Sequence, residues 1–114
     1  MEKNAKVVII GGGVVGCSIL FHLAKFGLKD CILLERKELT SGSSWHAAGN
    51  VHVISNDPNI SRLMAYTIRL YKEIEETSGH STGFKPSGGF YLASNEVWDD
   101  YLKRERSKAR YMGL

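Results

Sequence analysis

Three consecutive glycines at the end of a short apolar run constrain the fold of this chain more than any other feature. Val7–Ile10 is an uninterrupted β-branched run that predicts a strand buried on both faces of a parallel sheet, and Gly11–Gly13 ends it. The residues from Val14 to about Phe26 suit a helix, with Gly27 at its C′ position. Cys31–Leu34 is a second apolar strand. A strand, a helix and a strand within ~30 residues predict a βαβ unit and therefore an α/β fold.

The glycines also follow the spacing Gly-x-Gly-x-x-Gly at positions 11, 13 and 16. After a strand and at the start of a helix, this spacing indicates dinucleotide binding. We expect Gly11 to make the turn out of the strand, Gly13 to let a pyrophosphate approach the backbone, and Gly16 to let helix and strand touch. Free N–H groups and the positive end of the helix dipole would attract the diphosphate. A glycine turn in an empty βαβ unit is the alternative interpretation.

An acidic residue closes the second predicted strand. Glu35 lies 24 positions after Gly11, close to the spacing of about 20 that dinucleotide-binding units show. Its carboxylate can accept hydrogen bonds from the hydroxyls of an adenosine ribose, and it would repel a 2′-phosphate. The position therefore disfavours NADP.

Two more helices and a strand are expected in the second half of the chain. Asp57 and Pro58 are typical of an N-cap and a first helical position, so residues 58–78 should form an amphipathic helix that ends at Gly79. Gly88–Ala93 suits a strand, and Asn95 would cap a last helix. That helix should turn four apolar residues inward and a charged run outward: Val97, Trp98, Tyr101 and Leu102, then Lys103-Arg104-Glu105-Arg106.

Composition places few further limits. The 114 residues fit one domain, and 43% hydrophobic with 24% charged residues is typical of a globular protein. A net charge of +3 is too small to indicate nucleic acid or a membrane surface as a partner, and no run approaches the ~20 apolar residues of a membrane span. The short stretch before Val7 leaves no room for a signal segment, so the expected location is cytoplasmic. Two cysteines and three histidines lack ligand spacing, so no metal site is expected: Cys17, Cys31, His22, His52 and His80.

The segment Thr40–Asn56 has a different character, because it is rich in small residues and shows no sustained helical period. Loops of this length usually have a function. An NAD-binding half would normally continue here into another crossover helix and strand. Residues 40–49 instead read Thr-Ser-Gly-Ser-Ser-Trp-His-Ala-Ala-Gly, and the hydroxyls and amides of such a loop can wrap a pyrophosphate from the side opposite the first helix. This favours an extended flavin over NAD.

The glycine spacing, Glu35-Arg36 and above all Ser41–Gly49 resemble the glycine-oxidase and D-amino-acid-oxidase-like flavoproteins, most closely their dimethylglycine and sarcosine dehydrogenase branch. The Trp-His-x-Ala-Gly element is the specific part, and the resemblance extends over most of the chain. It implies an incomplete Rossmann-type, glutathione-reductase-like FAD-binding unit with the start of an α+β substrate domain. Residues 1–114 would be the amino-terminal part of the FAD-binding domain, and residues 80–95 would begin the substrate-domain sheet.

The resemblance also implies roles for individual residues. Glu35 would hold the ribose, and Arg36 would lie along the adenine and ribose. Ser43 and Ser44 would face the pyrophosphate, and an imidazole nitrogen of His46 would be bonded to the 8α-methyl group of the flavin. The predicted cofactor-binding residues are Gly11, Gly13, Val14, Val15, Gly16, Glu35, Arg36, Ser43, Ser44, His46, Ala48 and Gly49. From the residues alone, His46 suits a hydrogen-bonded surface position and Trp45 suits packing over the loop.

The activity that the resemblance implies is FAD-dependent oxidation of a secondary or tertiary N-methyl amino acid such as dimethylglycine or sarcosine. Tetrahydrofolate would be a further partner through a downstream domain. The flavin brings the chemistry, and the protein supplies orientation and electrostatics. No acid, base or carboxylate-binding residue is assigned within these residues. Three alternatives stay open: a non-catalytic dinucleotide-binding fragment, another amino-acid oxidase or dehydrogenase of the same superfamily, and an NAD-dependent dehydrogenase.

Overall fold

The computed structural model describes residues 4–112, which form two compact units divided after Asn50. The first unit contains strand β1 (Val7–Ile10), helix α1 (Val14–Lys25) and strand β2 (Cys31–Leu34). The second unit contains helices α2 (Pro58–Ser78) and α3 (Glu96–Tyr111). No helix among the described residues combines the length and the apolar character that crossing a bilayer would need.

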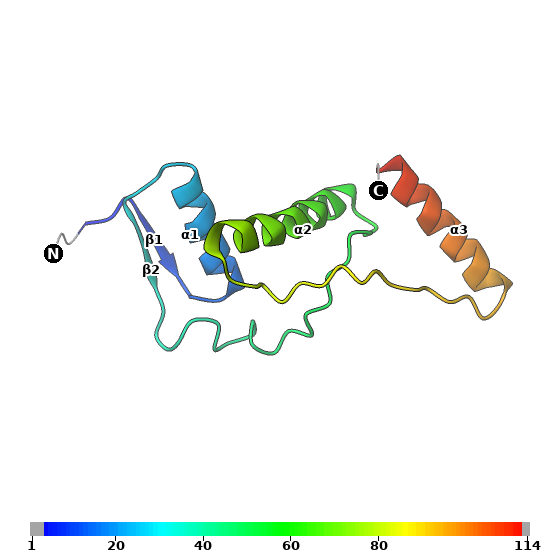
Figure 1. Cartoon of the computed structure of the whole chain (residues 1–114), viewed down its shortest axis with the longest axis horizontal. Coiled ribbons are helices and arrows are strands. Elements are labelled where there is room, and N and C mark those ends of the chain that lie inside the picture. Colours follow the sequence, from blue (N-terminus) through cyan, green and yellow to red (C-terminus); the bar gives the residue numbers. More distant parts are fainter. Residues whose placement is uncertain (1–3, 113–114) are drawn as a thin grey trace. The chain divides into compact units, whose positions relative to one another are not determined.

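The first unit is the predicted βαβ unit. β1 and β2 pair in parallel, with Val7 opposite Cys31 and Ile10 opposite Leu34. Figure 1 shows α1 in blue beside the two strands. In the chain, α1 follows β1 and precedes β2. α1 ends as the sequence predicts, because Gly27 has a φ of 86° and the N–H of Leu28 donates to the carbonyl of Leu23 at 2.9 Å. A left-handed glycine with this bond is a common way to end a helix.

The two-stranded sheet is covered on one face only among the described residues. Ile9 is buried at 8% exposure. The alternate side chains point to the other face and stay exposed, from 42% to 87%: Val8, Ile10, Ile32 and Leu34. The expectation of strands buried on both faces is therefore met for one face. Because β-branched and leucine side chains in such a pattern are typical of covered sheets, the open face is an apolar surface.

Gly16 lies buried in the first turn of α1, where the helix meets the end of β1. A Cβ atom on Gly16 would overlap the carbonyl oxygen of Gly11 and would lie 3.5 Å from Cγ2 of Ile9. This confirms that the position excludes a side chain so that helix and strand can touch.

α2 begins and ends at the predicted residues. Asp57 caps it, and its Oδ1 accepts the N–H groups of Asn59 at 2.7 Å and Ile60 at 3.3 Å. Pro58 occupies the first turn, and Gly79 closes the helix with a φ of 70°. Such caps satisfy backbone groups that a helix leaves without partners at its ends.

α3 is capped as predicted but does not pack as predicted. Oδ1 of Asn95 accepts the N–H of Trp98 at 3.0 Å. Acidic residues lie in the first turn and basic residues in the last, which suits the helix dipole. The expected inward face is wrong for three of its four residues, since Val97, Trp98 and Tyr101 are 78%, 52% and 43% exposed, whereas Leu102 is half-buried. Of the charged run, Glu105 is half-buried beside Lys108 and the other three side chains are exposed.

The segment between α2 and α3 contains no strand. Gly88–Ala93, which the sequence predicts as a strand, makes no backbone hydrogen bond to another described segment, and Phe90 and Leu92 are 96% and 89% exposed. An extended segment becomes a strand only by pairing, and no partner lies in the described part of the chain. That residues 80–95 begin a substrate-domain sheet stays a prediction.

Replacing Gly16 by alanine should lower the free energy of unfolding by about 3 kcal/mol, because the added methyl group overlaps backbone and not a movable side chain. Helix propensity alone predicts the opposite sign, by about 1 kcal/mol. Urea unfolding followed by circular dichroism measures the change. Gly42→Ala is the matched control, since a Cβ there meets nothing within 4 Å. Equal stability of the two variants would contradict the close contact.

Candidate functional site

The predicted glycine turn joins β1 to α1 with the geometry that the spacing implies. The N–H of Gly11 donates to the carbonyl of Leu34 at 2.8 Å, which extends the pairing of the two strands by one bond. Gly11 has a φ of 107°, which favours glycine, and the chain then turns into the helix. The expected role of Gly11 in the turn is confirmed.

The first turn of α1 presents backbone donors. Among the described residues, the N–H groups of Gly13, Val15 and Gly16 have no protein acceptor. The N–H of Val14 donates to Oγ of Ser44 at 2.8 Å. A Cβ on Gly13 would lie 3.2 Å from the same Oγ, which is a tight contact, so the glycine leaves room for this serine. Unpaired amides at a helix N-terminus are a common site for phosphate and other anions.

Gly12 is a contact point that the dinucleotide spacing does not include. Its N–H donates to Oε2 of Glu35 at 2.7 Å, and its carbonyl accepts the N–H of Thr40 at 2.8 Å. A Cβ on Gly12 would lie 2.5 Å from Cδ2 of Leu39 and 3.0 Å from Cβ of Glu35. The sequence signal was present, because Gly12 is the middle residue of a run of three glycines, but nothing in the spacing distinguishes it.

Glu35 is held as a carboxylate beside the glycine turn. The N–H of Gly12 and then that of Lys37, at 2.9 Å, hold its pKa below the ordinary glutamate value of 4.5. Hydrogen bonds donated to a carboxylate favour its charged form. Because a carboxylate offers about four lone-pair sites, Glu35 keeps acceptor capacity for further donors. Arg36 follows it with an exposed side chain and makes no side-chain hydrogen bond to other described residues.

The loop after β2 forms a series of tight turns and no helix, as the lack of a helical period predicts. The N–H of Trp45 donates to the carbonyls of Thr40 and Gly42. The N–H of His46 donates to the carbonyl of Ser43 at 3.2 Å. Thr40 has a φ of 65°, a left-handed conformation that is uncommon outside glycine. These turns bring Ser44 onto the start of α1.

The other predicted residues of this loop form no hydrogen bond with the glycine turn. Ser43, His46, Ala48 and Gly49 are exposed. The interpretation of Trp45 as a packing residue over the loop is wrong here, since its side chain is 74% exposed and its ring lies 6.3 Å from that of His46. Among the described residues, the ring of His46 is the one aromatic ring paired with that of Trp45. The roles predicted for the four exposed residues stay predictions.

Cysteines and metal ligands add nothing to the site. Cys17 and Cys31 are free thiols, and Sγ of Cys17 lies 3.5 Å from the carbonyl of Gly12. Residues 4–112 contain no group of three His, Cys, Asp or Glu side chains arranged to hold a metal ion. A separate groove of about 290 Å³ in the second unit lies between α2 and the end of α3, beside Arg62, Arg69 and Tyr111, and none of the predicted cofactor-binding residues lines it.

Comparison with known proteins identifies the family. The model of the FAD dependent oxidoreductase family matches residues 6–113. The chain belongs to this family. It is 43% identical over 107 residues to human dimethylglycine dehydrogenase, covering 94% of this chain and 12% of that protein. It is 41% identical over 115 residues to human sarcosine dehydrogenase, covering all of this chain and 12% of the relative.

A third relative carries a different kind of name. The mouse pyruvate dehydrogenase phosphatase regulatory subunit is 34% identical over 114 residues, which cover all of this chain and 13% of that protein. The chain thus spans about one eighth of the length of the curated relatives it matches. All three relatives are named as mitochondrial.

Glu35→Gln should make the first unit less stable at neutral pH, and the difference should shrink as the pH falls below 4.5. The folded carboxylate has the lower pKa, so its charge stabilises the fold above the unfolded value and is lost as the pH drops through the folded value. Melting temperatures from about pH 3 to about pH 7 measure this. Glu38→Gln is the control, since that side chain is exposed and bonds to no other described residue. A difference that does not change with pH would contradict the contact.

Proposed function

We propose that this chain is the adenine-dinucleotide-binding start of an FAD-dependent oxidoreductase that oxidises secondary or tertiary N-methyl amino acids. The observation that supports the cofactor most directly is the set of N–H groups at the start of α1: those of Gly13, Val15 and Gly16 have no acceptor within the described residues. Two phosphate groups of FAD would satisfy these donors, and the helix dipole would favour their charge.

The residues around these donors fit the adenylate half of FAD. Glu35 is charged, fixed by two backbone N–H groups, and retains lone pairs for the two hydroxyls of a ribose. A 2′-phosphate at that position would meet a carboxylate of the same sign. Ser44 already accepts the N–H of Val14, so its own O–H remains available to donate to a phosphate oxygen. Ser43, Arg36, Ala48 and Gly49 would complete the surroundings of the cofactor as the family resemblance implies.

The substrate class is supported by the names of two relatives. Dimethylglycine and sarcosine, after which these dehydrogenases are named, both carry a methyl group on the amine nitrogen. When bound, the flavin would supply the acceptor for the two electrons of the amine oxidation. Within residues 4–112 we assign no residue to the substrate, so this chain's role is to bind and orient the cofactor. Tetrahydrofolate as a partner, and a cytoplasmic rather than a mitochondrial location, stay predictions.

A second candidate function is regulatory. The similarity to a pyruvate dehydrogenase phosphatase regulatory subunit, at 34% identity over 114 residues, supports a regulatory role as the alternative. Under this alternative FAD would bind as a structural ligand. The two candidates differ in whether an amine reduces the bound cofactor.

The full-length protein should be yellow when purified, and sarcosine or dimethylglycine should bleach its flavin absorbance in the absence of oxygen. Glycine is the control compound, because it has the carboxylate and amine but no N-methyl group. Flavin that neither amine reduces would favour the regulatory candidate, and protein that takes up no FAD would exclude both. Stopped-flow absorbance spectroscopy measures the reduction.

We propose further that His46 forms the covalent link to the flavin that the family resemblance implies. Its side chain is exposed in the turn that follows Ser44, so no packing has to be broken for a ligand to reach it. Acid precipitation of the full-length protein should leave the flavin with the pellet, and the His46→Ala variant should release it. His52→Ala, in an exposed histidine of the same loop, is the control and should keep the flavin. Flavin in the supernatant of the unmutated protein would exclude the link.

A further inference from the structure

Thr40 has a backbone conformation that its residue type disfavours. Its φ is 65°, and among the described residues it is the one residue other than glycine with a left-handed φ. Because its side chain is branched at Cβ, this conformation is a steric outlier that a glycine would not be. Backbone outliers of this kind cluster at sites that bind ligands.

Two backbone hydrogen bonds fix Thr40 in this conformation. Its N–H donates to the carbonyl of Gly12 at 2.8 Å, and its carbonyl accepts the N–H of Trp45 at 3.1 Å. All three residues lie in the first unit. These bonds explain why position 40 is left-handed. They do not explain why it is a threonine, because glycine would form the same two bonds without the steric cost.

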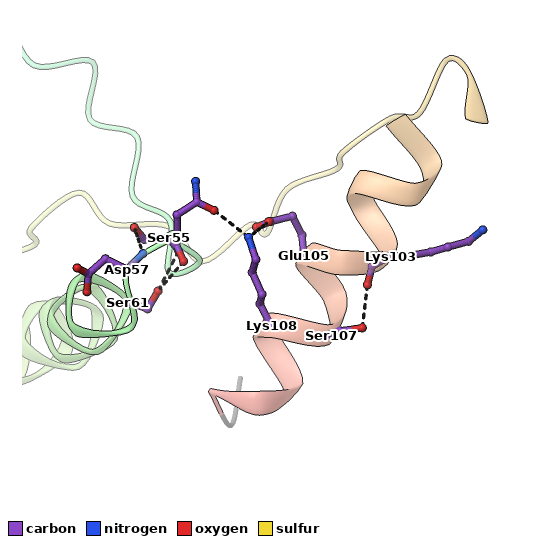
Figure 2. Close-up of polar contacts among 8 residues, drawn as sticks. Ser55, Asp57, Ser61, Lys103, Glu105, Ser107 and Lys108 are labelled. Atoms are coloured by element: carbon purple, nitrogen blue, oxygen red, sulfur yellow. Dashed lines mark hydrogen bonds and ion pairs between the residues drawn. The ribbon is translucent and has the colours of Figure 1, made fainter. Parts of the chain in front are cut away.

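The side chain of Thr40 has no partner among the described residues. It is exposed, and its hydroxyl forms no hydrogen bond with any of them. Figure 2 shows two hydroxyls that do have such partners. Ser61 donates to the carbonyl of Ser55 at 3.4 Å. Ser107 donates to the carbonyl of Lys103 at 3.0 Å. A free surface hydroxyl is common, but at Thr40 it comes with a steric cost, so we expect its partner to be a ligand.

Thr40 is held beside the proposed phosphate site. Gly12, which accepts its N–H, is followed by Gly13, whose own N–H has no acceptor among the described residues. The turn that begins at Thr40 also contains Ser44, whose Oγ accepts the N–H of Val14 at the start of α1 at 2.8 Å. A threonine hydroxyl can donate to a phosphate oxygen, as a serine hydroxyl can. The position of Thr40 therefore suits the diphosphate.

We propose that Thr40 binds the diphosphate of FAD, with its hydroxyl donating a hydrogen bond to a phosphate oxygen. The inference rests on the proposed function, because the ligand is the cofactor assigned there. It adds a residue that neither the glycine spacing nor the family resemblance predicts as cofactor-binding. Because a hydrogen bond to a charged group is stronger than a neutral one, its loss should weaken binding about ten-fold.

Three substitutions at position 40 separate the hydroxyl from the backbone. The probe is ADP, titrated by calorimetry into the full-length apoprotein from cells limited in riboflavin. Thr40→Val keeps the branched Cβ and removes the hydroxyl, so the dissociation constant for ADP should rise about ten-fold at an unchanged melting temperature. Thr40→Ser keeps the hydroxyl, so its dissociation constant should stay within about two-fold of the unmutated value.

Thr40→Gly should change affinity and stability differently. Its dissociation constant for ADP should rise about ten-fold, because the hydroxyl is lost. Its melting temperature should be equal or higher, because relief of the steric cost offsets the greater freedom of glycine in the unfolded chain. A turn residue with a purely structural role would keep its affinity for ADP in this variant.

Thr67→Val is the matched control, since it makes the same exchange in the second unit. The hydroxyl of Thr67 donates to the carbonyl of Leu63 at 2.9 Å within α2. This variant should bind ADP within about two-fold of the unmutated protein. A second ligand separates the phosphates from the ribose: 2′,3′-dideoxy-ADP lacks both ribose hydroxyls, and Thr40→Val should weaken its binding about ten-fold as well.

Four results would overturn the proposal or part of it. Unchanged affinity of Thr40→Val for ADP, or an equal loss in Thr40→Ser, would exclude the hydroxyl contact. An effect of Thr40→Val on ADP that disappears with the dideoxy analogue would place the contact at the ribose and exclude the phosphate. A lower melting temperature of Thr40→Gly would contradict the steric cost. Should Thr40→Val fail to fold, the comparison of Thr40→Gly with Thr40→Ser carries the same test.

Failure of the proposed function would look different. Unmutated protein that binds neither ADP nor FAD would reject that function and this inference with it. The melting temperatures of Thr40→Gly and Thr40→Val are measured without ligand, so they test the steric cost in either case.

Discussion

The bond between the N–H of Gly12 and the carboxylate of Glu35 is the contact on which the geometry of the first unit depends. It joins the residues that follow β1 and β2 and fixes the acidic side chain beside the start of α1. The bond is short, at 2.7 Å, and charge-assisted, a class of hydrogen bond that is roughly twice as strong as a neutral one. The same glycine accepts a bond from Thr40 through its carbonyl, so the loop after β2 is placed by the same residue.

The charges at the glycine turn determine which ligand groups it suits. One carboxylate with a lowered pKa lies beside a helix N-terminus whose amides are without acceptors among the described residues. The negative group suits ribose hydroxyls and the amides suit phosphate, so the arrangement matches an adenosine diphosphate in both polarity and order.

Local signals predicted the elements well because the residues that determine them are close in sequence. The turn at Gly11, the cap at Asp57 and the helix-ending glycines at 27 and 79 all depend on residues close in sequence, and each was confirmed. The predicted strand at Gly88–Ala93 and the inward face of α3 failed for the opposite reason, because pairing and packing need a partner that the described residues do not provide. The role of Gly12 was not predicted, because its contacts are with Leu39 and Glu35, which lie more than twenty residues away in sequence. The burial of Ser61 in α2, at 2% exposure, was not predicted, because a serine inside an amphipathic helix gives no sign that it will be buried.

The chain belongs to the FAD dependent oxidoreductase family through a match over residues 6–113. Our central proposal concerns one contact, in which the amides of the glycine turn bind the phosphates of the cofactor. The most direct test is a titration of the ¹⁵N-labelled apoprotein with FAD, followed by amide resonances in two-dimensional NMR. We predict that the resonances of Gly13, Val14, Val15 and Gly16 shift together and saturate with FAD, with little change for the amides of α3. Saturating FAD that leaves these four amides unmoved would contradict the account.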